Sequence, residues 1–375
     1  MTRVLLLSRY GVLPPPSRYR FYQFLPYLRQ RGMEFEVAPL LSDEYVSAQY
    51  SSRRFSLSPL PAIYSRRIRS LMNSSNFDLV WLEKEALPWF PVGLEHLFGL
   101  SRVPYVVDYD DATFHTYDRH SSKFVRWMLG DKIARLMAGA AIVVAGNEYL
   151  AEHARAAGAR RIEMMPTVVD LLKYPSEPAP LKAEPFTIGW IGSPANSRHL
   201  QMIGGALEKF CSATGSRVHI VGGWNADLPA GLPVQYFPWS EDTEVESMRR
   251  FDVGIMPLYP GPWENGKCGL KLINYMAAGL PTVASPVAVN RQIIDEDITG
   301  FKVDSEEEWI AALTRLRDDP ALRRRLGAAG RAKVERQYSL AYAAPKMADW
   351  LLSVAGKTSA RASGTSTWVS QAGKN

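Results

Sequence analysis

The chain has 375 residues, of which 46% are hydrophobic and 22% charged, and its formal net charge is +6. This length exceeds what one hydrophobic core usually serves, so we expect two domains. The positive charge favours an anionic partner, which could be phosphate on a small molecule, an acidic lipid surface or nucleic acid. Two cysteines are too few for a disulfide framework or a cysteine-based zinc site, which fits a reducing, cytoplasmic setting. No apolar run approaches about eighteen residues, so the sequence predicts a soluble or at most peripheral protein.

The first half of the chain alternates apolar runs with helical patterns. Runs typical of buried strands occur at residues 4–8, 35–40, 77–83, 103–111 and 140–147. Amphipathic segments, several of them basic, lie between these runs. Such alternation predicts a parallel sheet with helices on both faces.

The same alternation restarts in the second half. Further strand-like runs occur at 186–192, 217–223, 234–239, 252–258, 281–285 and 300–303. Between the halves, the segment YPSEPAPLKAEP has four prolines and no periodicity, which is typical of a linker. The expected divisions are a first domain at 1–173, a linker at 174–185, a second domain at 186–339, an amphipathic helix at 340–356 and a disordered polar tail at 357–375.

Several cofactor motifs are missing from the loops that follow the predicted strands. The first strand leads into SRYGVLPPPSRYR, which lacks the Gly-x-Gly-x-x-Gly pattern of a dinucleotide site. The sequence has no Walker-type Gly-Lys-Ser/Thr loop, and its six histidines show no metal-ligand spacing. We therefore expect neither a cofactor nor a metal.

The stretch WENGKCGLKLINYMAAGLPTVASP, residues 263–286, is the best candidate for a binding loop. Gly266 and Gly269 let the backbone approach a ligand closely, and a helix beginning near Gly269 would point free N–H groups at an anion. Lys267, Lys271 and Asn274 would share one face if helical geometry reached back to Lys267. The pattern suits a diphosphate beside a hydroxylated group, although a glycine-rich turn before a helix is often only a turn.

A longer stretch, GKCGLKLINYMAAGLPTVASPVAVNRQIIDEDITGFKV, resembles the donor-binding segment of retaining glycosyltransferases of family 4. The segments AAIVVAGNEYLAEHA, MMPTVVDLLKY, FTIGWIGSP and DVGIMPL extend the resemblance over most of the chain. It implies an α/β protein of the GT-B fold, with two Rossmann-like doubly wound domains facing a central cleft and a C-terminal helix crossing back to the N-terminal domain. It also implies transfer of a sugar from a nucleotide-diphosphate donor, held by the C-terminal domain, with retention and without an obligatory metal.

The resemblance assigns roles to residues of the candidate loop. Gly269 and Leu270 match the positions whose backbone amides face the donor phosphates. Asn274 stands where the family's Glu-x7-Glu motif has its second glutamate, which binds the ribose hydroxyls; an amide can still donate and accept hydrogen bonds there. The first glutamate, which touches the transferred sugar, aligns with Gly266, so Glu264 is the available substitute.

The family's Arg/Lys pair after the first strand of the second domain is also replaced. The segment beginning at Gly192 reads GSPANSRH, in which Ser193 takes the arginine position and Arg198 is the cation nearest to the lysine position. We therefore expect Lys267 and Lys271 to neutralise donor phosphate, with Lys271 stabilising the departing diphosphate during catalysis. Trp239 aligns near the nucleotide base, where it could stack on the base or simply pack within the domain.

Carboxylates and cations also gather near predicted strand ends in the first half. Asp110 and Asp111, in VVDYDDATFH, are candidates for orienting the acceptor hydroxyl or stabilising positive charge on the sugar. The structural alternative is a cap or turn made by either residue, with Asp108 paired to an arginine. In PPPSRYR, an N-cap role is equally plausible for the serine. We place three residues of that segment on the acceptor side: Ser17, Arg18 and Arg20.

The basic segment RHSSKFVRWMLGDKIARLMAG, residues 119–139, suits either docking on anionic lipid or ordinary packing of its apolar face. The leading prediction is a glycosyltransferase of cell-envelope polysaccharide biosynthesis, cytoplasmic or peripheral to the inner face of the membrane. It would use a nucleotide-diphosphate sugar and a glycan or lipid-linked acceptor, and no nucleic acid. A nucleotide-sugar 2-epimerase shares this architecture, but the long basic first half and the donor-loop match argue against it. A catalytically degenerate relative, which would bind a nucleotide sugar or a partner protein, is favoured by the loss of both motif glutamates.

Overall fold

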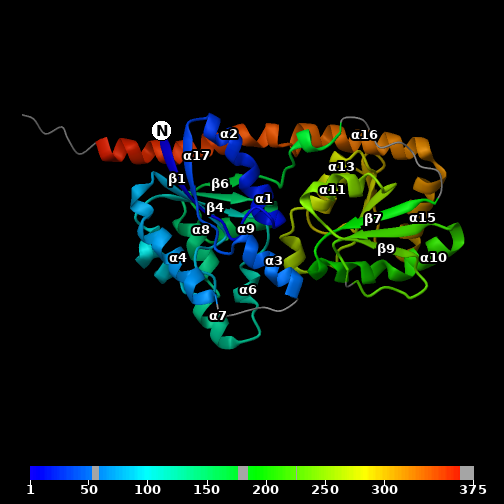
Figure 1. Ribbon diagram of the computed structural model, residues 1–375, viewed down its shortest axis with the longest axis horizontal. Helices are drawn as coiled ribbons and strands as arrows, with labels where there is room; N and C mark the ends of the chain where they lie inside the picture. The colour runs from blue at the N-terminus through cyan, green and yellow to red at the C-terminus, as the bar shows by residue number, and fades with distance from the viewer. Residues whose placement is uncertain (53–58, 176–184, 225, 364–375) are drawn as a thin grey trace, which may run out of the picture. The chain divides into compact units, whose positions relative to one another are not determined.

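The computed structural model describes residues 1–52, 59–175, 185–224 and 226–363 (Figure 1). Two compact units make up the chain. Unit 1 contains Met1–Tyr109, Thr113–Met164 and the chain from Ala344 onward, whereas unit 2 contains Asp110–Ala112 and Met165–Ala343. Most of the predicted linker, residues 176–184, lies outside the described residues, as does the end of the predicted tail, residues 364–375.

Unit 1 is built on a six-stranded parallel sheet with the order β2-β1-β3-β4-β5-β6. Its central strands are wholly buried and rich in Val, Leu and Ile, as expected for a sheet covered on both faces. The register places Val4 opposite Phe35 on one side and Leu79 on the other. The strands are β1 (Thr2–Leu7), β2 (Met33–Val37), β3 (Leu79–Glu83), β4 (Tyr105–Tyr109), β5 (Ile142–Ala145) and β6 (Ile162–Met164).

The helices of unit 1 mostly connect successive strands. The α-helices are α1 (Pro15–Arg20), α2 (Leu25–Gln30), α3 (Asp43–Ser52), α4 (Leu60–Met72), α5 (Val92–Glu95), α6 (His115–Asp118), α7 (Lys123–Leu129), α8 (Lys132–Gly139) and α9 (Glu148–Ala156). Short 3₁₀ or π segments are η1 (Tyr22–Phe24), η2 (Ser74–Asn76) and η3 (His96–Leu100). The basic segment 119–139 is therefore not one helix, because the chain breaks between α7 and α8 at Gly130 and Asp131.

Unit 2 repeats the architecture with the strand order β12-β11-β10-β7-β8-β9, again parallel throughout. This is the 3-2-1-4-5-6 order of a doubly wound sheet. The direction in which successive strands are added to the sheet reverses between β7 and β10. The corresponding reversal in unit 1 lies between β1 and β3. The strands are β7 (Thr187–Ile191), β8 (Arg217–Val221), β9 (Val234–Phe237), β10 (Val253–Met256), β11 (Thr282–Ala284) and β12 (Gly300–Lys302).

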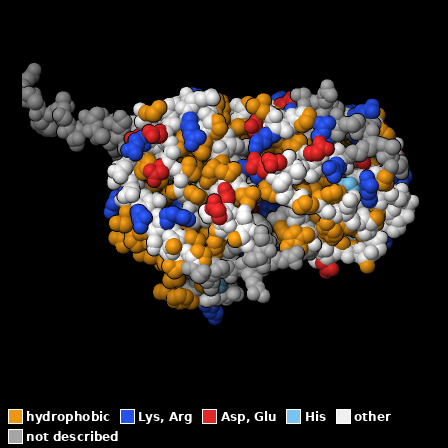
Figure 2. Space-filling view, viewed as in Figure 1, with side chains coloured by type: hydrophobic (Ala, Val, Ile, Leu, Met, Phe, Trp, Pro, Cys, Tyr) orange, Lys and Arg blue, Asp and Glu red, His pale blue; other side chains and the backbone are white. Residues whose placement is uncertain are grey.

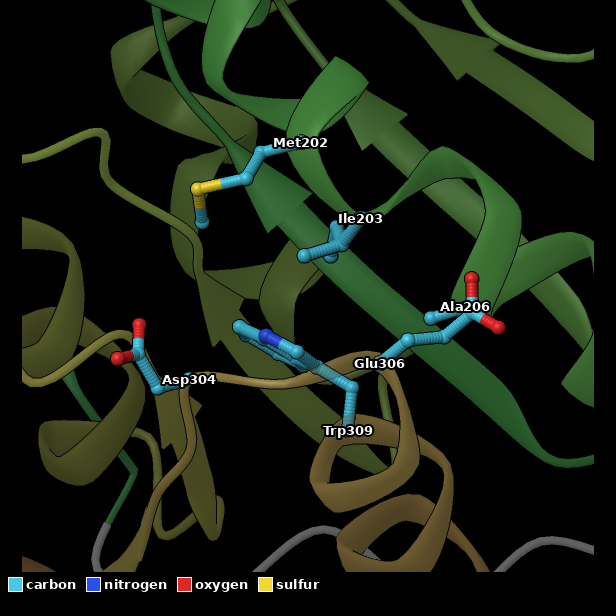
Figure 3. Close-up of a pocket in the computed structure, with 6 residues that line it drawn as sticks. All are labelled: Met202, Ile203, Ala206, Asp304, Glu306 and Trp309. Carbon is cyan, nitrogen blue, oxygen red and sulfur yellow. The ribbon is translucent and has the colours of Figure 1, made fainter.

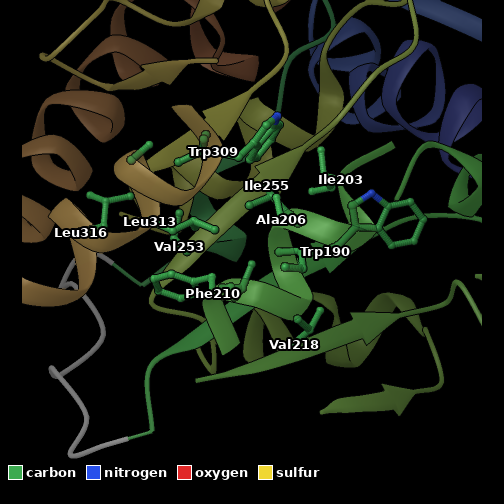
Figure 4. Packing of buried hydrophobic residues seen from close by; sticks show 14 of the residues in the cluster. Trp190, Ile203, Ala206, Phe210, Val218, Val253, Ile255, Trp309, Leu313 and Leu316 are labelled. Carbon is green, nitrogen blue, oxygen red and sulfur yellow. The ribbon is translucent and has the colours of Figure 1, made fainter. Parts of the chain in front are cut away.

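The core of unit 2 forms where helices cover this sheet. Figure 4 shows Trp190 of β7, Phe210, Val253 and Trp309, which belong to one hydrophobic cluster and are all almost completely buried. The helical segments are η4 (Leu171–Lys173), η5 (Pro194–Ile203), α10 (Gly204–Thr214), α11 (Glu241–Met248), α12 (Pro262–Asn265), α13 (Leu270–Ala277), α14 (Asn290–Ile293), α15 (Glu306–Asp318) and α16 (Pro320–Gln337).

The last helix, α17 (Leu340–Ser363), belongs to unit 1 from Ala344 onward. Arg31 at the end of α2 forms an ion pair with Asp349 of α17, and Arg161 donates a hydrogen bond to Ser353 (Figure 1). The expectation that the final helix returns to the N-terminal domain is therefore confirmed. The helix continues past Gly356, where the sequence suggested that order would end. Among the described residues, no helix is long and apolar enough to cross a membrane.

Candidate functional site

Helix α13 is fixed at the point where unit 2 reverses its strand order. The hydroxyl of Tyr275 accepts a hydrogen bond from the backbone N–H of Ile191 at 3.0 Å and donates one to the carbonyl of Ile255 at 3.4 Å. These contacts tie α13 to the carboxyl ends of β7 and β10. Open α/β sheets bind ligands at this position, outside the carboxyl ends of the strands.

The start of α13 is set by Gly269. This residue has φ +68°, in the left-handed region, and a Cβ there would clash with the side chain of Ile293. Glycine is therefore required, and the helix begins at Leu270, as the sequence predicted. The first N–H groups of a helix have no acceptor within it and attract anions. Helical geometry does not reach Lys267, so the face that was to join Lys267, Lys271 and Asn274 is not formed.

Lys271 is a half-buried cation at this helix start. Its ammonium lies 5.2 Å from the centre of the Trp190 ring, and a Cβ added to Gly192 would lie 2.8 Å from its Cε. Burial lowers the pKa of Lys271 to about 7; the charge of Lys267 acts in the same direction, while Asp111 opposes it. The ammonium forms no hydrogen bond or ion pair with any residue that the structure describes. A bound anion would restore its charge.

The loop before α13 lies against Asp110–Ala112, which cluster with unit 2. The Lys267 ammonium lies 3.5 Å from the Asp111 carboxylate. Gly266 packs so closely on the backbone of Ala112 that a Cβ at position 266 would clash with it. The close approach leaves no room for a side chain at position 266.

Glu264 is the buried carboxylate of this loop. It accepts a charged hydrogen bond from Arg198 at 2.7 Å and lies 3.9 Å from Nε2 of His199. The structure thus pairs two residues to which the sequence gave separate roles. Burial lowers the pKa of His199 to about 4, with the charge of Arg198 adding to the effect, so the ring is neutral at pH 7.

Asn274 lies in a buried polar cluster within unit 2. Tyr174 donates to its carbonyl oxygen at 3.1 Å, and its amide nitrogen donates to Glu244 of α11, also at 3.1 Å. All three residues are at most 6% exposed. A carboxylate therefore stands next to position 274, although it comes from another helix. Sequence reasoning missed Glu244 and Tyr174, because no local pattern links residues so far apart.

Trp239 follows β9 and is half-buried. A Cβ at Gly222 would lie 3.2 Å from Cβ of Trp239 and still closer to the carbonyl oxygen of Gly192. Trp239 thus lies near the ends of β7 and β8. Ser193, exposed next to Gly192, accepts a hydrogen bond from Asn196 at 3.0 Å and starts η5.

The acceptor-side candidates lie inside unit 1. Ser17, Arg18 and Arg20 are each at most 4% exposed. Ser17 donates to Glu83 at 2.6 Å and is not an N-cap, because α1 is capped at Pro14 without a side-chain bond. Nη1 of Arg18 donates to the carbonyl of Leu13.

Arg20 binds both oxygens of Asp108, at 2.8 and 2.9 Å. The structural alternative for Asp108, pairing with an arginine, is therefore confirmed.

A second polar cluster follows β4 and β5 and was not predicted. Asp118 contacts Nδ1 of His115 at 2.9 Å, and Nε2 of His115 lies 2.7 Å from the hydroxyl of Tyr149. His115 ends the stretch VVDYDDATFH, so its position after a strand was the available signal. Within the described part of the chain, no group of three or more His, Cys, Asp or Glu side chains could hold a metal ion.

A pocket in unit 2 lies between η5, α10 and α15 (Figure 3). Its lining contains none of the predicted site residues. The indole N–H of Trp309 is buried there with no hydrogen-bond acceptor in the described residues. The lining residues are Met202, Ile203, Ala206, Asp304, Glu306 and Trp309.

Solved structures share this fold across nearly the whole chain. Sucrose-phosphate synthase from Thermosynechococcus elongatus has 14% identity and a TM-score of 0.69, covering 95% of this chain and 100% of that one. HepE from Anabaena, solved with UDP-glucose, has 14% identity and a TM-score of 0.70, covering 94% and 100%. WaaG, a glycosyltransferase involved in lipopolysaccharide biosynthesis, has 15% identity and a TM-score of 0.64, covering 92% and 98%. The two units are thus the Rossmann-like domains of a GT-B fold.

Residues 185–319 match the family model of Glycosyl transferases group 1. This segment contains Gly192, Trp239, Glu264, Lys271 and Asn274. The predicted resemblance to glycosyltransferases is confirmed. No match was found among curated protein sequences.

Proposed function

We propose that the protein is a metal-independent retaining glycosyltransferase that moves a sugar from a nucleotide-diphosphate sugar to a glycan or lipid-linked acceptor. The proposal rests on one observation about Lys271. Its ammonium forms no ion pair with the described residues, and it lies at the start of α13, where the strand order of unit 2 reverses. HepE was solved with UDP-glucose, which makes UDP-sugars the first donors to test.

The donor diphosphate binds at the start of α13 in this proposal. The amides of Leu270 and Lys271 donate to phosphate oxygens, and the side chains of Lys267 and Lys271 supply positive charge. Lys267 is close to Asp111, so the phosphate competes with that carboxylate for its charge. Arg198 is engaged by Glu264 and makes a smaller contribution.

The transfer breaks the bond between the anomeric carbon and the diphosphate oxygen and forms one to the acceptor oxygen on the same face. The acceptor proton passes to an oxygen of the departing diphosphate, so charge and atoms balance without a further reactant. Lys271 stabilises the negative charge that develops on the leaving group. We assign Asp110 and Asp111 to orienting the acceptor hydroxyl and to stabilising positive charge on the sugar.

The ribose of the donor contacts the cluster of Asn274 and Glu244. Glu244 supplies the carboxylate that related sequences carry at position 274, and Asn274 keeps it in place through their 3.1 Å hydrogen bond. Glu264 takes the place of the first motif glutamate, because Gly266 has no room for a side chain. Trp239 stacks on the nucleotide base from its position near the ends of β7 and β8.

Unit 1 carries the supporting residues. Arg20 holds Asp108 at the end of β4, immediately before Asp110 and Asp111. Ser17 and Arg18 fix the loop after β1 in the same way. We therefore propose positioning roles for these three, in place of direct acceptor contact. The cellular setting that we propose is the cytoplasm and the inner face of the membrane, in cell-envelope polysaccharide synthesis.

The test is a screen of UDP-, ADP-, GDP- and dTDP-sugars against the purified protein. Two quantities are measured with each donor: the melting temperature of the protein and the rate of donor hydrolysis. The proposal predicts one donor class that both raises the melting temperature and is slowly hydrolysed. Protection by a nucleotide sugar without hydrolysis or transfer would favour a binding protein without turnover, which the altered positions 266 and 274 suggest as the second candidate. Neither effect with any donor would contradict both functions.

A further inference from the structure

Helix α7 exposes large aromatic side chains of unit 1. Trp127 is 80% exposed and Phe124 is 61% exposed, and their rings lie 5.9 Å apart. Only Leu129, at the end of the helix, is buried. The helix therefore turns its aromatic residues to solvent, which contradicts the packing alternative for this part of the basic segment. Figure 2 shows hydrophobic side chains beside a cation at the lower edge of the view, where Figure 1 labels α7.

A second pair of exposed aromatic residues lies near the segment that leads into this helix. Trp89 and Phe90 are 48% and 40% exposed, and the Trp89 ring lies 5.7 Å from that of His120. Arg126 of α7 donates to the carbonyl of His120 and, at 2.9 Å, to that of Ser121. Trp89 thus lies near His120, and His120 is held by a hydrogen bond from Arg126 of α7.

The backbone at Trp89 is strained. Its φ is +66°, a value that a bulky side chain rarely adopts, and its N–H donates to the hydroxyl of Tyr117 at 3.0 Å. The fold thus keeps this half-exposed ring in a costly conformation. We call Trp89, Phe90, Phe124 and Trp127, with the cations beside them, the α7 face.

The charged residues of the α7 segment are all positive. Residues 119–129, RHSSKFVRWML, include Arg119, Lys123 and Arg126 and no carboxylate. The acidic residues that flank this stretch are already engaged, Asp118 by His115 and Asp131 by Arg135. Exposed Trp and Phe among cations, with no acid between them, match the interface of a bilayer that contains anionic lipids.

A second copy of the chain fits this surface less well. A two-fold interface would bring the same patch onto itself, and the three cations would then face three cations. An anionic lipid surface instead provides opposite charge over the whole area, together with an apolar layer that accepts the rings.

We propose that the α7 face docks the protein on an anionic bilayer, with Trp127 and Phe124 entering the headgroup region and the cations contacting lipid phosphates. This inference does not depend on the proposed transfer reaction, because it rests on unit 1 alone. Each cation near such a surface strengthens binding by about fivefold.

The experiment is sedimentation of the full-length protein with vesicles, without any nucleotide sugar. One set of vesicles is phosphatidylcholine and the other contains about one third phosphatidylglycerol. We expect binding to the anionic vesicles that weakens with salt and little binding to phosphatidylcholine alone. The double variant Phe124→Ser/Trp127→Ser should lose at least about tenfold in affinity.

The matched control is Trp224→Ser/Tyr236→Ser, which removes two exposed aromatic residues of unit 2 that are 52% and 44% exposed. It should bind vesicles like the wild type, and both variants should keep the wild-type melting temperature. Equal binding by the wild type and the α7 variant would overturn the proposal. So would a wild-type dimer that the α7 variant converts to a monomer, because the face would then bind a second copy.

Discussion

The strand reversals of the two units are topologically equivalent, but their polar groups are arranged differently. At the end of β3 in unit 1, Glu83 accepts from Ser17 and from the backbone of Arg9, and nearby Arg20 is clamped to Asp108. At the end of β7 in unit 2, Lys271 has no ion pair among the described residues and a pKa lowered to about 7. A buried charge that is already paired is needed to balance its partner, whereas a cation without a counter-ion is available to a ligand.

The largest expected effect is a loss of stability in Asp108→Ala, and an unchanged stability would contradict the contrast between the two units. The substitution removes the carboxylate that accepts two hydrogen bonds from the buried Arg20 guanidinium, and removing one partner of a buried pair costs about 3–5 kcal/mol of unfolding free energy. Urea unfolding measures the loss. The control is Arg31→Ala, which breaks the exposed pair with Asp349 and should cost less than about 1 kcal/mol. Similar losses for the two variants would contradict the structural role of Arg20 and Asp108.

Lys271→Ala, in contrast to Asp108→Ala, should weaken ligand binding and leave stability almost unchanged. Loss of a charged contact of about 1.5–3 kcal/mol would weaken nucleotide-sugar binding about 10- to 100-fold. Unfolding free energy should change by less than about 1 kcal/mol, because the ammonium has no ion pair to lose. Binding and unfolding are compared with Lys209→Ala, which removes an exposed lysine paired with Glu306. A stability loss without a binding loss would mean that Lys271 is structural.

Substitutions at position 274 test whether Glu244 supplies the carboxylate that binds the ribose. Asn274→Glu places a second carboxylate against Glu244, and we expect about a tenfold loss of donor affinity from this repulsion. Adding Glu244→Gln transfers the carboxylate to position 274 and should recover most of the affinity. Titration of the donor into both variants measures this. If the double variant binds no better than Asn274→Glu alone, Glu244 does not supply the ribose carboxylate.

The same lysine, Lys271, predicts a pH dependence of donor binding. The Lys271 pKa of about 7 lies below its ordinary value, so the charge that binds diphosphate is present below pH 7 and is lost above it in the free protein. Binding restores the charge, and affinity should therefore fall about 50-fold between pH 7 and 9, approaching tenfold per pH unit at the upper end of this range. Lys271→Arg should remove this dependence, because arginine stays charged. A wild-type affinity that is constant over this range would exclude Lys271 from the phosphate contact.

Local patterns predicted the sheets and the start of α13. The runs VLLLS and FTIGWIG are strands because short, continuous apolar segments suit a sheet covered on both faces, and glycine at 269 fits a left-handed helix start. The strand Ile162–Met164 was missed, because it is short and only partly buried.

Side-chain partners could not be predicted, because they depend on tertiary approach. Arg20 and Asp108 are 88 residues apart, and Tyr174 and Asn274 are 100 residues apart. The contact of Gly266 with Ala112 also joins distant segments, and it leaves no room for a side chain at position 266. The resemblance to glycosyltransferases could thus be inferred from the loop, whereas the packing of the loop's residues required the structure.

Calorimetry of nucleotide-sugar binding in two buffers of different ionisation enthalpy tests the central claim most directly, since the difference gives the number of protons taken up. A nucleotide-diphosphate sugar has no group of its own that titrates near pH 8. At that pH most Lys271 is neutral in the free protein, so wild-type binding should take up close to one proton and Lys271→Arg none. Tight wild-type binding without proton uptake would contradict the placement of the diphosphate at Lys271.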